Sequence, residues 1–309
     1  MPSRSLNPHA PGLAFVAAVL GFGGGSVLGK LILGRGVGAL ELLPVRYSVA
    51  LISLIAVMLM AGRLRRLDRD TWRKGMLLGA INMAGTSIFL TLGLEHLSAS
   101  VMSLMLGLVP LTTVAFAHLL IEGEKMHPGL LPGFVLALAG TAFLVEGTGN
   151  AGANPAVGFA LAGVAVVAAG SGGALTRRFA LTTPAAELIV PQFVGAAAIV
   201  LATSAVTGSL AGISEMDGVS WGLTAIFGLG ATTVPFAAML WLSESTTAAR
   251  VALISYLTPL VGVAGGVLIL DEPLGLRLVL GGVLILTGVV LADRSERRAH
   301  RRAIAATTL

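Results

Sequence analysis

Ten long apolar stretches alternate along the chain with short polar segments. They cover residues 12–34, 40–62, 75–93, 98–121, 129–146, 157–176, 184–207, 221–243, 247–270 and 276–292. Each run is continuous and does not alternate with a period of two, which favours helices over the strands of a barrel. Because a helix needs about 20 apolar residues to cross a bilayer, the pattern predicts ten transmembrane helices.

The composition agrees with a polytopic membrane protein. Hydrophobic residues make up 55% and charged residues 11% of the 309 residues, against roughly 25% charged residues in a soluble globular chain. Cysteine is absent, which excludes disulfides, thiolate chemistry, iron–sulfur clusters and cysteine zinc sites. The first stretch is not a typical secretory signal, because its apolar run exceeds a signal core and no small-residue cleavage site follows.

Lysine and arginine fall almost entirely on one side of the predicted membrane. With a cytoplasmic N-terminus, 16 of the 20 lie in cytoplasmic segments, and the outer loops hold only Arg35 and Arg277. Excess positive charge marks the cytoplasmic side, so we expect both termini in the cytoplasm, beneath a cell inner membrane. The basic tail at 293–309 is then expected to contact anionic lipid rather than nucleic acid.

The second half of the chain repeats the first at an offset of about 149 residues. The segment LVPL at 108–111 matches LTPL at 257–260, and G-x-x-L-x-L-x-G begins at both Gly133 and Gly281. Further counterparts, in the same order, are Glu124 and Glu272, Glu41 and Glu187, Pro44 and Pro191, Arg46 and Gln192, and Lys30 and Arg177. Each half has five spans, an odd number, so the second copy must cross the membrane inverted. Inverted repeats are typical of secondary transporters, whose substrate site lies near the midplane between the repeats; the alternative is a duplication kept for packing alone.

At these positions the chain resembles a known family. The small-residue segment before Lys30, the pair Pro44 and Arg46, and the alanine-rich approaches to Pro110 and Pro259 are similar to paired EamA domains of the drug/metabolite transporter superfamily. The glutamate-then-glycine start of the fifth and tenth spans matches as well.

The resemblance covers nearly the whole chain, as a first repeat at 12–146 and a second at 157–292. One departure is Phe22, where many members carry tryptophan. The resemblance implies an all-α fold of ten helices around a central cavity, cytoplasmic termini, and export or exchange of small metabolites, often amino acids.

Two motifs imitate other chemistry. Residues 24–30 satisfy G-x-x-x-x-G-K, but Leu31 replaces the hydroxyl residue that ligates magnesium, and no strand precedes the motif. Glycines four residues apart between 21 and 29 are better explained as a smooth face for close helix packing. His118 and Glu122 are four apart but too few to hold a metal. We therefore expect no cofactor and no metal.

Ionisable groups within the predicted spans are few. They are Lys30, Glu41, Arg46, Glu146 and Glu187, all toward span ends. Because burying charge in a bilayer is costly, such groups are functional candidates. Two interpretations stay open: a structural ion pair, in which Glu41 or Glu95 neutralises Lys30 and Arg46, and a carboxylate or proton-relay site.

Polar and aromatic groups at related depths in the two repeats are the candidates for a substrate path. They are Asn82, Thr86, Ser103, Gly107, Pro110, Thr232, Thr233, Trp241, Ser255, Tyr256 and Pro259. The prolines free carbonyls about one turn back, and such carbonyls can bind a ligand where they line a cavity. The alternative for each hydroxyl is a hydrogen bond within its own helix or to a neighbouring helix.

Together these features predict a carrier, not an enzyme, that exports small metabolites by alternating access. Amino acids are the favoured substrate class, the lipid bilayer is the other partner, and a monomer is compatible with the sequence. The alternatives are an integral-membrane enzyme acting on lipid-linked substrates, a passive channel, and a carrier of the same superfamily for sugars, nucleotide sugars or drugs.

Overall fold

The computed structural model describes residues 10–124, 126–147 and 154–307, except the side chains of 146–147, 248–249 and 299–307. In this part of the chain, ten helices are long and apolar enough to cross a membrane, and all ten predicted spans are confirmed. Four features named from the sequence lie outside the described residues: Arg4, Lys125, the Glu146 side chain and the basic side chains beyond Arg298.

The spans of the first repeat are α1 (Ala10–Leu33), α2 (Ala39–Met60), α3–η1–α4 (Arg69–Leu78, Gly79–Gly85, Thr86–Leu94), α5–α6 (Ala99–Leu106, Val109–Leu120) and η2–α7 (Pro128–Leu130, Leu131–Gly147). Those of the second repeat are α8 (Pro155–Ala180), α9 (Ala185–Val206), α10–η4–α11 (Gly218–Gly228, Leu229–Thr233, Val234–Ser245), α12 (Ala248–Ile269) and α13 (Leu276–Thr307), with η3 (Ala211–Glu215) between α9 and α10.

The third span of each repeat begins at an aspartate cap. Asp68 accepts a hydrogen bond from the backbone N–H of Thr71 at 2.9 Å, and Asp217 accepts one from Ser220 at 2.9 Å. A capped first turn is stable without apolar residues. For this reason α3 begins at Arg69, several residues before the apolar run that started the predicted span at 75.

A π-helix interrupts the same span in both repeats. It is η1 in the first repeat and η4 in the second. A Cβ on Gly228, just before η4, would lie 2.5 Å from the carbonyl oxygen of Arg46, and one on Gly79 would collide with the carbonyl of Gln192. Only glycine permits such close approach, so Arg46 and Gln192 occupy corresponding places.

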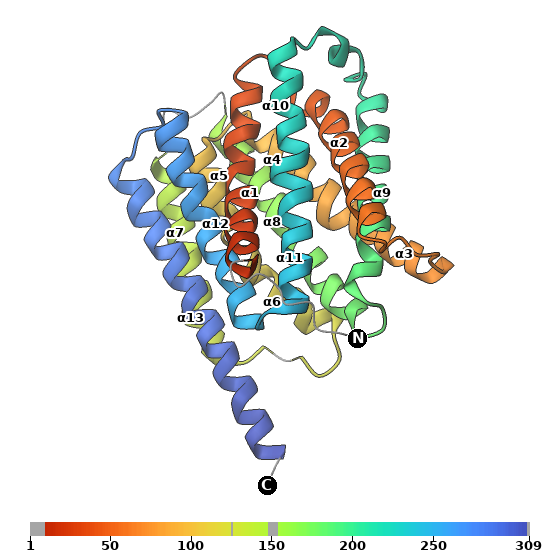
Figure 1. Ribbon diagram of the computed structural model, residues 1–309. Coiled ribbons are helices and arrows are strands. Elements are labelled where there is room, and N and C mark those ends of the chain that lie inside the picture. Colours follow the sequence, from red (N-terminus) through yellow and green to blue (C-terminus); the bar gives the residue numbers. More distant parts are fainter. Residues whose placement is uncertain (1–9, 125, 148–153, 308–309) are drawn as a thin grey trace.

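Corresponding elements lie at opposite ends of the molecule. The end where α1 begins and α13 leaves the bundle is called here the basic end; the other, which holds the loops 34–38, 95–98, 207–217 and 270–275, is the opposite end (Figure 1). Asp68 lies at the basic end, and its counterpart Asp217 lies at the opposite end. The second repeat is therefore inverted relative to the first.

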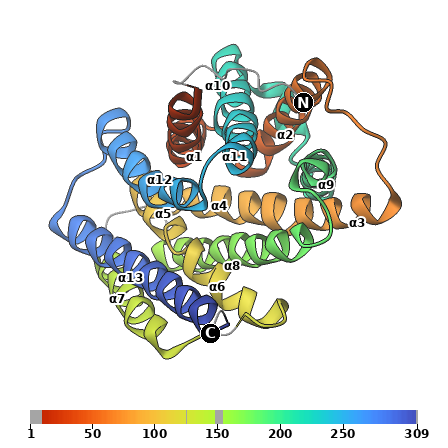
Figure 2. The same ribbon diagram turned by 60° about the horizontal axis from the view of Figure 1, so that its bottom comes forward.

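Helices of the two repeats alternate through the bundle. α3, η1 and α4 run beside α8 across the middle, while α13 packs along α7 at one edge (Figure 2). α1 packs against α11 and α12, and α2 against α9. Every one of these pairs joins one repeat to the other, so neither repeat has an interior of its own.

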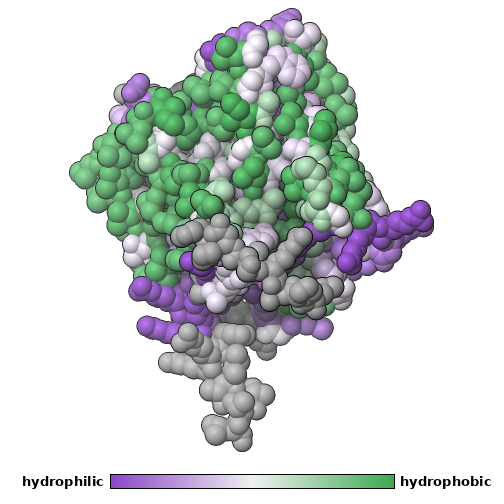
Figure 3. All heavy atoms as spheres, in the orientation of Figure 1, coloured by the Kyte–Doolittle hydropathy of each residue, from purple (hydrophilic) through white to green (hydrophobic). Residues whose placement is uncertain are grey.

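The outer surface is apolar. Large side chains such as Ile52, Leu119 and Leu268 are 68%, 73% and 80% exposed. Hydrophobic residues cover most of the face of the bundle that Figure 3 shows. Hydrophilic residues gather below them, at the basic end. A surface of this kind fits lipid around the helices and water at their ends.

Candidate functional site

The fourth and ninth spans form a tight contact in the half of the molecule near the opposite end. Gly107 lies against Pro259, because a Cβ on Gly107 would be 3.2 Å from the proline ring. A Cβ on Gly262 would collide with Ser103, and one on Gly266 would collide with Ser100. We call this contact the α5–α12 seam. The structure thus brings Ser103, Gly107 and Pro259 together, but as packing partners.

A carboxylate fastens the seam at its outer edge. Glu272 accepts hydrogen bonds from the backbone N–H groups of Ala99 at 2.6 Å and Ser100 at 2.9 Å, the first residues of α5. The hydroxyl of Ser98 caps the same turn through the N–H of Val101 at 3.2 Å. Glu272 thereby joins the loop after α12 to the start of α5.

Two basic side chains, those of Lys30 and Arg35, make further contacts between helices and loops at the opposite end. Lys30 donates to the carbonyl of Leu94 at 2.6 Å. Arg35 donates to Asp217 at 2.5 Å and to the hydroxyl of Ser220 at 3.1 Å. Hydrogen bonds from Ser220 and then from Arg35 lower the pKa of Asp217 to about 2. Asp217 is thus fully ionised and bound to Arg35 at neutral pH.

The basic end has a cavity beside the start of α12. A cavity of about 890 Å³ opens between the ends of α1, α11 and α13 and the start of α12. Its walls are Pro11, Ser245, Thr246, Thr247, Arg250, Leu253, Tyr256, Val290, Asp293, Arg294 and Arg297. Of the residues proposed from the sequence for a substrate path, Tyr256 lines this cavity.

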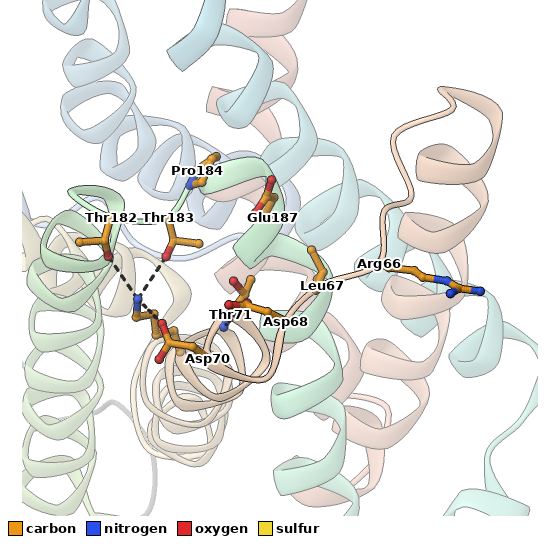
Figure 4. A pocket seen from close by; sticks show the side chains of 10 residues that line it. Arg66, Leu67, Asp68, Asp70, Thr71, Thr182, Thr183, Pro184 and Glu187 are labelled. Carbon is orange, nitrogen blue, oxygen red and sulfur yellow. Dashed lines mark hydrogen bonds and ion pairs between the residues drawn. The ribbon is translucent and has the colours of Figure 1, made fainter.

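A second cavity, of about 430 Å³, lies between the start of α3 and the α8–α9 loop (Figure 4). Thr182 and Thr183 point toward Asp70 across it and accept hydrogen bonds from Lys74 at 3.2 Å each. The hydroxyl and N–H of Thr71 hold the pKa of Asp68, in the same wall, below its ordinary value. This is the inverted counterpart of the place where Arg35 binds Asp217.

Arg46 is buried without an acidic partner. It is 8% exposed, its guanidinium carbon lies 3.9 Å from the ring centre of Phe227, and it donates to the hydroxyls of Thr232 at 2.9 Å and Ser87 at 3.5 Å. No ion pair among the described residues includes Arg46. Its positive charge is therefore balanced by rings and hydroxyls alone.

The expectation that Glu41 or Glu95 neutralises Arg46 is wrong. Glu41 accepts a hydrogen bond from the N–H of Gly38 at 2.8 Å, and Glu95 accepts one from Ala39 at 3.3 Å. Both carboxylates satisfy N–H groups at the start of α2, which have no partner within the helix. For Lys30 the outcome differs, because Glu95 also interacts with it electrostatically.

The remaining candidates are spread over several environments. Thr232 and Thr233 are buried and donate to backbone carbonyls of Phe227 at 3.2 Å and Ala50 at 3.0 Å. Trp241 is partly buried among apolar side chains, and Ser255 is exposed. Asn82 lies against Gly172, the Thr86 hydroxyl is buried with no hydrogen-bond partner, and Pro110 is partly buried at the start of α6.

The segment that resembles a phosphate-binding loop and the pair His118 and Glu122 both have structural explanations. Residues 24–30 lie inside α1, where Gly21 meets the carbonyl of Gly230 and Gly29 meets Leu94, so the glycines serve close packing as expected. His118 lies near the backbone of Glu124 and Met126. No cluster of three metal-ligating side chains exists among the described residues.

Glu272 and Glu124 were not identified from the sequence as candidate functional residues. Glu272 and Glu124 were recognised as counterparts, but the spacing carried no information about what they bind. Glu124 lies at the basic end and accepts a hydrogen bond from Arg177 at 3.0 Å. One sequence signal could have indicated this site. The two glutamates occupy corresponding positions of the repeats, and each directly follows a span that contributes to the seam.

Known proteins agree with this architecture. No curated protein sequence matches the chain significantly. A solved structure described as "Crystal structure of protein" is similar at 20% identity and a TM-score of 0.63, over 92% of this chain and 98% of that one, which shows a shared fold. The model of the EamA-like transporter family matches residues 11–146 and 156–292, one match in each repeat. The chain belongs to the EamA-like transporter family.

Proposed function

We propose that this chain is a secondary carrier that exports small metabolites, amino acids above all, by alternating access. The observation that carries the proposal is a difference between the two ends of the molecule: α12 packs against α5 near the opposite end but not along α6 near the basic end. The α5–α12 seam is packed shut at the opposite end, while a cavity of about 890 Å³ lies at the basic end. A carrier caught in one of two mirrored states has this form.

The basic end is assigned to the cytoplasm. Its described basic side chains are Arg63, Arg65, Arg66, Arg69, Arg73, Lys74, Arg177, Arg178, Arg250, Arg294, Arg297 and Arg298, whereas Arg35 and Arg277 lie at the opposite end. Loops rich in lysine and arginine stay on the cytoplasmic side. The structure then represents the state open to the cytoplasm, in which an exporter loads its substrate.

Arg46 supports a substrate that carries a carboxylate. A buried guanidinium without a counter-ion is costly, and arginine binds carboxylates with two parallel hydrogen bonds. Arg46 lies in the half of α2 toward the opposite end, behind Phe227. A carboxylate that enters from the basic end would reach Arg46 once the Phe227 ring moves aside. This chemistry favours amino acids over neutral sugars or cationic drugs.

Transport by purified protein in proteoliposomes tests the proposal. We expect saturable counterflow of at least one labelled amino acid from a panel, measured with and without a pH gradient. Saturation and counterflow distinguish a carrier from a channel. If no amino acid moves or competes, while sugars or nucleotide sugars do, the substrate class is wrong; if nothing is exchanged, carrier function itself is rejected.

A further inference from the structure

Glu124 and Glu272 occupy corresponding positions at opposite ends of the molecule. Each follows a residue with positive φ, Gly123 at 87° and Asp271 at 52°. Glycine adopts this conformation freely, and aspartate is one of the few other residues that tolerates it. Each turn comes just after the seam span of its repeat, α6 or α12. The two carboxylates thus occupy equivalent positions in the two repeats.

Their partners nevertheless differ. Glu272 holds the first two N–H groups of α5, at 2.6 and 2.9 Å. Glu124 instead accepts a hydrogen bond from Arg177 at 3.0 Å. What lies opposite each carboxylate therefore differs: the start of α5 for Glu272 and the side chain of Arg177 for Glu124.

The counterpart of the start of α5 is the start of α12. Ala99 and Ser100 correspond to Ala248 and Ala249 at the offset of 149. The N-cap of α12, Thr247, makes no side-chain capping hydrogen bond, whereas Ser98 caps α5. The cavity of about 890 Å³ adjoins this helix start, so space for a carboxylate exists there.

The seam has a matching second half. The packed pair Ser103 and Gly262 corresponds to Ala252 and Thr113, and the pair Gly107 and Pro259 corresponds to Tyr256 and Pro110. In this structure Tyr256 lines the cavity, and α6 packs against α8. α12 thus packs against α5 in one half of the seam but not along α6 in the other, and we call these the closed and the open half.

We propose that Glu272 and Glu124 are alternating latches. Glu272 holds α5 when the opposite end is closed. When the basic end closes, Glu124 leaves Arg177 and accepts hydrogen bonds from the N–H groups of Ala248 and Ala249, while Glu272 releases α5. This inference rests on the proposed alternating access, and it adds the residues that fasten each state.

The released carboxylate has a cation to receive it at each end. Arg177 holds Glu124 in this structure. Its counterpart Lys30 interacts electrostatically with Glu272 but spends its hydrogen bond on the carbonyl of Leu94. In the other state Lys30 takes Glu272. A glutamate that has released its helix start is thus paired with a cation, and no unpaired carboxylate remains near the membrane.

Single cysteines can report both ends, because the chain contains none of its own. Ser103→Cys and Ala252→Cys are counterparts, one in the closed half of the seam and one in the open half. Val263→Cys and Val114→Cys form a second such pair if the first folds poorly. The measurement is the rate of labelling by a membrane-impermeant maleimide in proteoliposomes, on unchanged, Glu272→Gln and Glu124→Gln backgrounds.

We expect the two latch variants to shift labelling in opposite directions. Loss of a capping carboxylate shifts a two-state equilibrium by about fivefold. Glu272→Gln raises labelling of Ser103→Cys and lowers that of Ala252→Cys, and Glu124→Gln does the reverse. Glu122→Gln, an exposed neighbour in the same loop, is the control and changes neither rate. Labelling that rises at both reporters, or at neither, overturns the proposal.

Labelling and transport separate this inference from the proposed function. Opposite shifts in a protein that moves no tested solute support the latches and reject amino-acid export. Amino-acid counterflow with labelling insensitive to both variants supports export and rejects the latches.

Discussion

The guanidinium of Arg35 lies 2.5 Å from the carboxylate of Asp217, and it joins the loop after α1 to the first turn of α10. The two residues belong to different repeats. At the inverted place, around Asp68 and Thr183, the structure has a cavity of about 430 Å³. Lys74 spans that place through hydrogen bonds to the neutral hydroxyls of Thr182 and Thr183, so the two ends differ in having an ion pair or neutral partners there.

Asp217→Asn is expected to loosen the opposite end without unfolding α10. Asparagine caps a helix as well as aspartate does, so only the charge that binds Arg35 is lost. We expect faster maleimide labelling of Ser103→Cys and a small decrease in the melting temperature, measured by tryptophan fluorescence. Combined with Arg35→Gln, the change should add little more, because both substitutions remove the same pair.

The same pair predicts a pH dependence. The pKa of Asp217 is about 2 in the folded protein, below the value of about 3.9 in an unfolded chain. Its contribution to stability is therefore complete above about pH 5 and disappears as the pH falls through about 2. The difference in melting temperature between Asp217→Asn and the unchanged protein should narrow only below about pH 5. Narrowing that is already evident above about pH 6 would contradict this prediction.

Arg46 is expected to distinguish an amino acid from its amide. A buried guanidinium gains much more from a carboxylate than from a neutral carboxamide. In competition assays Arg46→Gln should lose this preference by about tenfold or more, while Arg46→Lys retains part of it. An unchanged ratio in folded Arg46→Gln protein removes Arg46 from the substrate site. The ratio, unlike the overall rate, does not depend on how much protein is active.

Gly79 should tolerate no side chain. A Cβ there would collide with the carbonyl of Gln192, and overpacking of this kind costs about 1–3 kcal/mol. Gly79→Ala is expected to lower the melting temperature in detergent. Gly222→Ala is the matched control on α10, where nothing lies within 4 Å of the added atom. Equal effects of the two substitutions would show that helix contact at η1 is not the cause.

Removing both latches should restore the balance between the two states. An exposed ion pair such as that of Arg177 with Glu124 contributes about 0–1 kcal/mol, and a capping bond contributes about 1 kcal/mol. The double variant Glu124→Gln with Glu272→Gln is therefore expected to label Ser103→Cys and Ala252→Cys in nearly the unchanged ratio. Labelling that follows the Glu272→Gln variant alone would show that Glu124 holds nothing in the other state.

Tyr256 and Asn82 test the two environments of the substrate path. Tyr256 lines the larger cavity, and Asn82 lies against Gly172 within the bundle. We expect Tyr256→Phe and Asn82→Ala to change the apparent affinity for a transported amino acid by several-fold, in protein that elutes as a folded species. Unchanged transport kinetics in both variants would exclude them from the path.

Several residues of the candidate site were predicted from the sequence, but the structure gives them a different role. Ser103, Gly107 and Pro259 were chosen for a substrate path, and the structure places them in a helix contact. Small residues suit both purposes, since they admit a ligand or a neighbouring helix equally well. Arg46 was identified correctly as an unusual charge, but its assumed partners were taken by the helix start at Gly38 and Ala39.

The amino-acid sequence by itself determined the ten spans, because bilayer thickness fixes how many consecutive apolar residues a helix requires. It also determined the duplication, and the odd number of spans made the second copy inverted. Only the tertiary structure decided which half of the seam is closed and which glutamate is engaged. Glu124 and Glu272 both follow a residue with positive φ at the end of a seam span, and their partners depend on which helix start lies beside each of them, which the sequence pattern does not reveal.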